Sequence, residues 1–274
     1  MGKRVWSSPR GTAWVELGDD TVLRFESSDE WLESVRRTIR RVASLDAPVA
    51  LPVIGDAIEK GEPAGYEALV VRFAPARARS ERVLAPARAC AVVAELASLV
   101  AAHRAQADPE VLGPFDPALV VETDDGDRVI APGLAKLAIT HDQGVRGLRG
   151  GTRLSHYRST VDQIRDTPGL PHEVTCLAVL LVELVAGREP YPTDSEFAYL
   201  TAVSKGEHDP IDTLAPRLGR ELRRTIERAL RVEAASRPSL EELRAALLAE
   251  PGARERTSTP EAEPPPRRPW WKLW

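Results

Sequence analysis

The sequence predicts an α+β protein in which a small strand-rich unit with one helix precedes a larger helical unit. Short apolar segments bounded by turn residues dominate residues 1–75, whereas apolar residues at helical spacing dominate residues 76–250. After residue 250 the composition shifts to Pro, Glu and Arg, which predicts a disordered tail over 251–274. We therefore expect two packed units followed by a tail.

Composition narrows the classes of function. The chain has 274 residues, enough to bury a substantial core, and its net charge of −4 makes nucleic acid an unexpected partner. Cys90 and Cys176 are the only cysteines and lie in apolar surroundings, which indicates reduced core thiols. The five histidines match no ligand spacing, so no metal site is expected. The polar start lacks the apolar stretch of a signal peptide, and we expect a cytoplasmic protein.

The N-terminal unit begins with a predicted hairpin. Its strands are Thr12–Leu17 and Thr21–Phe25, joined by the turn residues 18–20. Ser27, with Glu30 three positions later, is typical of a capping box and predicts the start of a helix. The apolar stripe of this helix is Leu32, Val35, Ile39 and Val42.

Two further strands are predicted around Val49–Ile54 and Ala68–Phe73. In the second unit, Ala89–His103 has the pattern of a long apolar helix. Ala118–Glu122 and Arg128–Ala131 are predicted to pair around an Asp-rich turn.

Residues 133–171 are rich in Gly, Arg, Thr and Ser and predict a long loop. Helices are then expected at 173–186, 194–205, 219–231 and 239–249. The last of them carries a capping box formed by Ser239 and Glu242.

Several stretches together resemble the protein kinases, most closely the bacterial Ser/Thr type, over about residues 5 to 249. His172–Tyr191, ending Gly-Arg-Glu-Pro-Tyr, is similar to the central buried helix of that family and the residues after it. Leu222–Leu243, with Ala-Ser-Arg-Pro-Ser near its end, resembles the closing helices, and Leu69–Pro75 resembles the fifth strand and hinge. The resemblance implies a two-lobed fold with a nucleotide cleft between the lobes.

The residues that phosphoryl transfer requires are replaced in the register of this resemblance. The family places a Lys on the third strand, a Glu on the helix, a catalytic Asp, and an Asn and an Asp for magnesium. This chain has, in the same order, Arg24, Thr38, Pro114, Leu119 and Ala131. Proline, leucine and alanine can neither accept a proton nor bind a hard cation. The resemblance therefore implies a pseudokinase that binds a protein partner as a scaffold or regulator, with no catalytic residues, metal or cofactor.

Alternatives remain open. A divergent active Ser/Thr protein kinase would bind ATP and Mg²⁺, with Arg24 as the candidate nucleotide contact and Asp116 or Asp124 as displaced acids. The simpler interpretation of Asp124, Asp125 and Asp127 is a hairpin turn, and that of Asp116 is a surface or capping role. A small-molecule phosphotransferase would need the same missing acids.

The resemblance also implies structural roles. Asp162 stands near the position of a buried family acid that pairs with the arginine matching Arg237, so an Asp162–Arg237 ion pair is expected. Glu173 stands at the buried helix acid that holds the catalytic loop in the family. Arg146, Arg149, Arg153 and Arg158 populate the long loop, where they either bind an acidic partner or are simply solvated.

The tail ends in a cluster of tryptophan and basic residues. A short docking motif would use Arg267, Arg268, Trp270, Trp271, Leu273 and Trp274 as anchors for a partner. The same residues also suit contact with a membrane interface, or with the chain's own domain. An adaptor recruited through this tail is therefore a further alternative.

Overall fold

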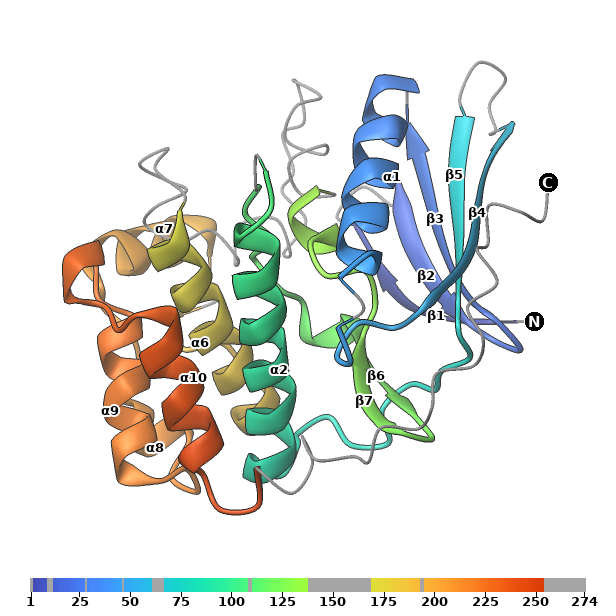
Figure 1. The fold of residues 1–274 in the computed structure, drawn as a ribbon. Helices are drawn as coiled ribbons and strands as arrows, with labels where there is room; N and C mark the ends of the chain where they lie inside the picture. Colours follow the sequence, from blue (N-terminus) through green and yellow to red (C-terminus); the bar gives the residue numbers. More distant parts are fainter. Residues whose placement is uncertain are drawn as a thin grey trace.

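The computed structural model describes residues 2–8, 12–27, 29–45, 47–60, 67–107, 110–137, 169–192 and 195–253. The protein is mixed α+β, as expected, with an antiparallel sheet followed by a mostly helical unit (Figure 1). The predicted tail, from residue 254 onward, and residues 138–168 of the predicted long loop lie outside the described ranges.

The sheet has five strands in the order β1-β2-β3-β5-β4. They are β1 (Lys3–Ser7), β2 (Ala13–Leu17), β3 (Thr21–Ser27), β4 (Val53–Lys60) and β5 (Glu67–Phe73). The predicted first hairpin is confirmed, because β2 pairs with β3 with Val15 opposite Leu23. Strand β1 was not predicted, and β4 begins four residues later than the start of the predicted strand, Val49.

One helix, α1 (Asp29–Ala43), covers one face of the sheet (Figure 1). The predicted cap at Ser27 is wrong, because Ser27 is the last residue of β3 and pairs with Glu67. The predicted apolar stripe is correct: Leu32, Val35, Ile39 and Val42 are all buried. This stripe fixes which face of α1 meets the sheet.

The two faces of the sheet differ because the side chains of a strand alternate. On β3, Leu23 and Phe25 are fully buried in one apolar cluster with Leu32 and Val35 of α1. Arg24 lies between them in sequence and is half-buried, as the alternating pattern of β3 requires. Arg24 therefore lies on the face away from α1.

The helical unit is built around α2 (Pro86–Arg104) and α6 (Leu170–Ala186), which pack against one another. Further helices in the described ranges are α7 (Glu196–Lys205), α8 (Ile211–Leu214), α9 (Arg220–Ala229), α10 (Leu240–Ala249) and the 3-10 turn η2 (Ala234–Ser236). Both halves of the predicted capping box at Ser239 and Glu242 are present. The short helix α8 was not predicted.

A second, two-stranded sheet lies between the two units, as Figure 1 shows. Its strands are β6 (Val120–Thr123) and β7 (Gly126–Val129), and the 3-10 turn η1 (Pro117–Leu119) precedes it. The predicted hairpin is confirmed, although β6 begins two residues later than expected because Pro117–Leu119 forms the 3-10 turn, and β7 begins two residues earlier than expected. A helical turn begins at Leu134, inside the stretch predicted as a loop.

Among the described helices, α2 has the length and apolar composition of a membrane span. Most of it is buried within the protein, where it packs against α6 and α10. This packing accounts for its composition as that of a core helix.

Apolar packing joins the two units. One cluster holds the α1 face of the sheet together with Leu119, Ile130, Ala131 and Leu134. A second cluster holds the helical unit together with Val42 and Val49. Both clusters cross the predicted boundary at residue 75, so each unit contributes to the core of the other.

Candidate functional site

The candidate site is the region between the sheet and the helical unit, where the resemblance places a nucleotide cleft. It contains residues 112–119 before β6 and residues 130–137 after β7. Five replaced positions were predicted from the sequence, and the structure shows which of them come together.

Leu119 and Ala131 meet in the apolar cluster beneath the sheet. They are 3% and 4% exposed and share this cluster with Phe25 of β3 and Leu134. Ala131 has a φ of 40°, a left-handed conformation that is uncommon for a residue with a side chain. The backbone N–H of Leu134 donates to the Ala131 carbonyl (2.8 Å) and closes a turn there.

Thr38 and Pro114 are also buried at this region. Thr38 of α1 faces Gly133, since a Cβ built on Gly133 would lie 3.7 Å from the Thr38 methyl group. Gly133 has a φ of +98°, which favours glycine. The turn that follows Ala131 therefore packs closely against α1.

Arg24 lies away from the other four replaced positions. Its guanidinium contacts Glu26 (3.1 Å) and Glu59 (3.3 Å). It also lies over the Trp14 ring, 5.9 Å from the ring centroid, on the outer face of the sheet. The candidate nucleotide contact is thus separated from Leu119 and Ala131 by the sheet.

Asp116 ties the sheet to the helical unit. Its Oδ2 accepts a hydrogen bond from Nε1 of Trp6 on β1 (3.0 Å), and its Oδ1 accepts from the backbone N–H of Ala118 (2.8 Å). The second bond caps η1, so the capping role considered from the sequence is present. Asp116 is only 6% exposed, however, and is not a surface residue.

Glu173 holds the segment before Asp116. Its carboxylate accepts the backbone N–H groups of Leu112 (2.5 Å) and Gly113 (2.8 Å), and its side chain is fully buried. Burial raises the pKa of Glu173 above its ordinary value, although these two donors act in the opposite direction. Gly113 must be glycine, since a Cβ there would lie 2.7 Å from Sγ of Cys176.

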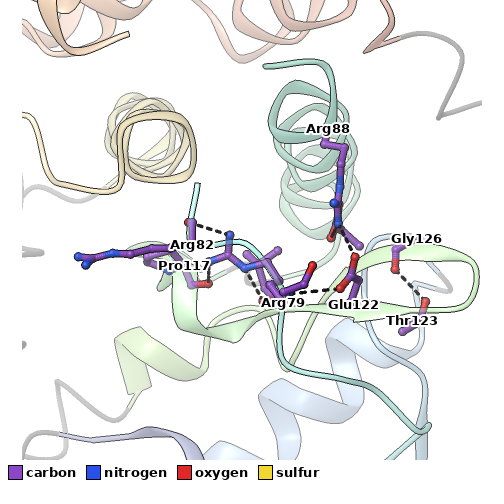
Figure 2. A network of polar contacts seen from close by, with 10 residues as sticks. Arg79, Arg82, Arg88, Pro117, Glu122, Thr123 and Gly126 are labelled. Atoms are coloured by element: carbon purple, nitrogen blue, oxygen red, sulfur yellow. Dashed lines mark hydrogen bonds and ion pairs between the residues drawn. The ribbon is translucent and has the colours of Figure 1, made fainter. Parts of the chain in front are cut away.

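The acids of the β6–β7 hairpin bind arginines (Figure 2). Arg88 of α2 donates to Asp127 (2.7 and 2.9 Å) and to Glu122 (3.0 Å). The bond to Asp127 and, to a smaller extent, that to Glu122 raise the pKa of Arg88. The bond from Arg88 lowers the pKa of Glu122. Asp124, at the turn, pairs with Arg77 (2.8 Å). The turn interpretation is correct for Asp124 and Asp125, whereas the buried pair of Asp127 with Arg88 was not predicted.

Arg79 binds the backbone of η1 and the start of β6, just before the hairpin turn (Figure 2). It donates to the carbonyls of Pro117 (2.9 Å) and Val120 (3.1 Å), and burial lowers its pKa. It therefore binds the backbone on both sides of Leu119. Sequence reasoning missed this residue, because an arginine in a loop carries no pattern that marks it as buried.

Arg237 is buried, as expected, with a 6% exposed side chain. Its guanidinium donates to the carbonyls of Pro171 (3.0 Å), Arg231 (2.8 Å) and Val232 (3.0 Å). Asp162 lies outside the described residues, so the predicted ion pair stays a prediction. The four loop arginines and the tail anchors from Arg267 to Trp274 also lie outside them.

Within the described ranges, no three His, Cys, Asp or Glu side chains gather as metal ligands. No family model matches the chain, and a search of the curated proteins finds no match. The function is therefore inferred from the residues and their geometry.

Proposed function

We propose that the chain is a protein-kinase-like domain without phosphoryl transfer, a pseudokinase, which acts as a protein-binding scaffold or regulator. Three features support the kinase-like assignment. The element order is the one that the resemblance implies, with a five-stranded sheet, one helix across it, and then helices that enclose a hairpin. Glu173 holds residues 112–113 through their backbone, which is the role implied for the acid at its position. Arg237 is buried beside the start of α6.

The absence of phosphoryl transfer rests mainly on one observation, the apolar filling between the sheet and residues 119–134. Leu119, Ala131 and Phe25 lie there together in one buried apolar cluster. A magnesium nucleotide carries several negative charges and needs oxygen ligands and N–H donors around it. Burying its phosphates among these side chains would leave charges without partners, which is strongly unfavourable.

The Trp6–Asp116 hydrogen bond supports the same proposal. It joins β1 to the segment that would carry the catalytic loop. A nucleotide that entered between these elements would have to separate them and leave the buried Asp116 carboxylate with one donor fewer. The bond therefore favours a closed arrangement without ligand.

The alternative of an active kinase has less support. Arg24 would have to act from the outer face of the sheet, where it contacts Glu26 and Glu59. Asp116 and Asp124, the displaced acids it would use, bind Trp6 and Arg77. The alternative of an adaptor recruited to a partner or membrane by its tail depends on residues 267–274 and is compatible with a pseudokinase body.

A phosphoryl-transfer assay tests the proposal. The purified chain is incubated with radiolabelled ATP and Mg²⁺ or Mn²⁺, alone and with a general protein substrate. We expect no label in protein and no inorganic phosphate above the background without enzyme. Transfer that disappears in Asp116→Ala, but not in the exposed variant Asp212→Ala, would instead assign catalysis to the chain.

A further inference from the structure

A cavity of about 660 Å³ lies against α2, and its lining includes no residue of α6 and none of residues 112–119 or 130–137 of the candidate site. Its walls come from the loop after α1, from α2, from the β6–β7 turn and from α10. Its apolar lining includes Leu45, Ala91, Val92, Leu99 and Leu248. This volume is in the range that accommodates one or two large side chains of a docking segment.

Glu95 of α2 is a half-buried acid in the lining of this cavity. Among the described residues it makes no hydrogen bond or ion pair. Burial raises its pKa, and the charge of Arg128 acts in the opposite direction. The arginines around it are already engaged: Arg88 with Asp127, Arg128 with the Pro48 carbonyl, and Arg244 with Oγ of Ser98 (2.7 Å). The cavity therefore suits an apolar ligand that also brings a cation or an N–H donor.

The described chain ends beside this cavity. After α10, Ala253 is fully buried, and a Cβ on Gly252 would lie 3.2 Å from Cβ of Ala87 in the first turn of α2. Figure 1 shows the segment after α10 reaching the start of α2. The next residue of α2, Arg88, already lines the cavity. The described chain thus ends with Gly252 against the residue of α2 that precedes the cavity-lining Arg88.

The remaining residues are long enough to reach all of α2. A Pro-rich segment extends about 3.1 Å per residue, so Trp270 can lie up to about 50 Å from Ala253. Helix α2 is only about 28 Å long at 1.5 Å per residue. A tether of this length gives an effective concentration on the order of millimolar, so a weak contact suffices to keep the segment bound.

We propose that this cavity is the docking site of the chain's own C-terminal segment, Arg267–Trp274. The indole rings supply the apolar surface that the walls require. An indole N–H, Lys272 or an arginine of the segment supplies the partner for Glu95. Docking covers the parts of α2 and of the β6–β7 turn that line the cavity. This inference does not depend on whether the chain transfers phosphate.

Limited trypsin digestion of the full chain tests this docking, with cleavage followed by mass spectrometry. The bond after Lys272 reports on the segment, and the bond after Arg256 is an internal reference in the same tail. Glu95→Arg places a like charge against the segment. Glu221→Arg, exposed in the first turn of α9 and outside the cavity, is the matched charge-reversal control.

We expect Glu95→Arg to speed cleavage after Lys272, relative to Arg256, by about tenfold, the change that 1.4 kcal/mol of contact free energy produces. Glu221→Arg leaves this ratio as in the wild type. Equal ratios in all three proteins would overturn the proposal. Protection that disappears on dilution would also overturn it, because the segment would then dock on a second copy.

Hydrogen exchange provides a second readout that does not depend on a cavity variant. The full chain is compared with Trp270→Ala/Trp271→Ala/Trp274→Ala, whose changes lie outside the described residues. We expect faster exchange in the variant for amides of α2 and the β6–β7 turn, and unchanged exchange in the five-stranded sheet. Identical exchange throughout would contradict docking at this site.

Discussion

The indole Nε1 of Trp6 donates a hydrogen bond of 3.0 Å to the Asp116 carboxylate, across 110 positions of the sequence. Trp6 belongs to the first strand of the sheet and Asp116 to the cap of η1, so one bond ties the sheet to the helical unit. Both side chains are buried, at 6% exposure each. A bond in this environment is costly to break, because neither group reaches water.

Trp6→Phe tests the tie between the sheet and the helical unit. Phenylalanine retains most of the apolar surface but leaves the buried carboxylate with one donor fewer. We expect a loss of about 1–3 kcal/mol in the free energy of unfolding. Trp14→Phe is the control, since Trp14 lies half-buried on the outer face of the sheet. Chemical denaturation measures both variants, and equal losses would show that the bond contributes nothing specific.

Glu173→Ala removes the acceptor for two backbone donors, those of Leu112 and Gly113. Each N–H left buried without a partner costs about 1–3 kcal/mol, so we expect a loss of several kcal/mol. Glu241→Ala, also in the first turn of a helix but exposed, should cost less than about 1 kcal/mol. Urea denaturation of both variants measures the difference. A mild effect of Glu173→Ala would mean that residues 112–113 do not depend on the carboxylate.

Arg88→Ala leaves Asp127 buried without its cation, since the Asp127 side chain is 3% exposed. We expect a loss of about 3–5 kcal/mol, whereas Arg77→Ala, from an exposed pair, should cost less than about 1 kcal/mol. Arg88→Ala/Asp127→Asn should recover part of the loss, because the uncompensated charge is gone. Thermal unfolding of the wild type, Arg88→Ala, Asp127→Asn and the double variant provides the double-mutant comparison, with Arg77→Ala as the exposed control. A double variant as unstable as Arg88→Ala would argue against the charge as the cause.

His103 predicts a pH dependence. Burial lowers its pKa from 6.5, and its Nδ1 has no partner among the described residues. A lowered folded-state pKa means that the unfolded chain binds the proton first on acidification. The stability that the protein has with His103 neutral is therefore fully present above about pH 6.5. It is lost as the pH falls through the folded-state pKa of His103.

His103→Gln removes this titration but keeps an amide that can donate to the Glu110 carbonyl, 3.1 Å from the imidazole Nε2. We expect the wild type to lose more stability than His103→Gln between pH 7 and pH 5. The difference in stability between the two proteins at pH 8 is the baseline for this comparison. Thermal unfolding across this range measures it. Parallel pH profiles would contradict the prediction.

Much of the fold was predictable because its elements carry local signals. The turn at residues 18–20 specified the β2–β3 hairpin, and the spacing of Leu32, Val35 and Ile39 specified α1. Ser239 with Glu242 marked the start of α10. Strand β1 was missed because Lys3–Ser7 has weak alternation, with only Trp6 buried, and it depends on pairing with β2.

The candidate site was less predictable, because its key contacts join distant residues. Leu119 and Ala131 were predicted as replaced positions from the resemblance to the protein kinases, and both lie in the region. The face on which Arg24 lies depends on the pleat of β3, and a shift of one residue reverses it. The bonds of Asp116 to Trp6 and of Asp127 to Arg88 form only when distant parts of the chain pack together. No spacing in the sequence therefore predicts them.

The most direct test of the central claim is a thermal-shift titration of the full chain with ATP, with and without Mg²⁺. A ligand that binds only the folded state raises stability by RT ln(1 + [L]/Kd), so millimolar ATP at micromolar affinity would add about 4 kcal/mol. With Leu119, Ala131 and Phe25 filling the region, we predict no shift under either condition. A shift that requires Mg²⁺ would show that the region opens to a nucleotide and would contradict the account.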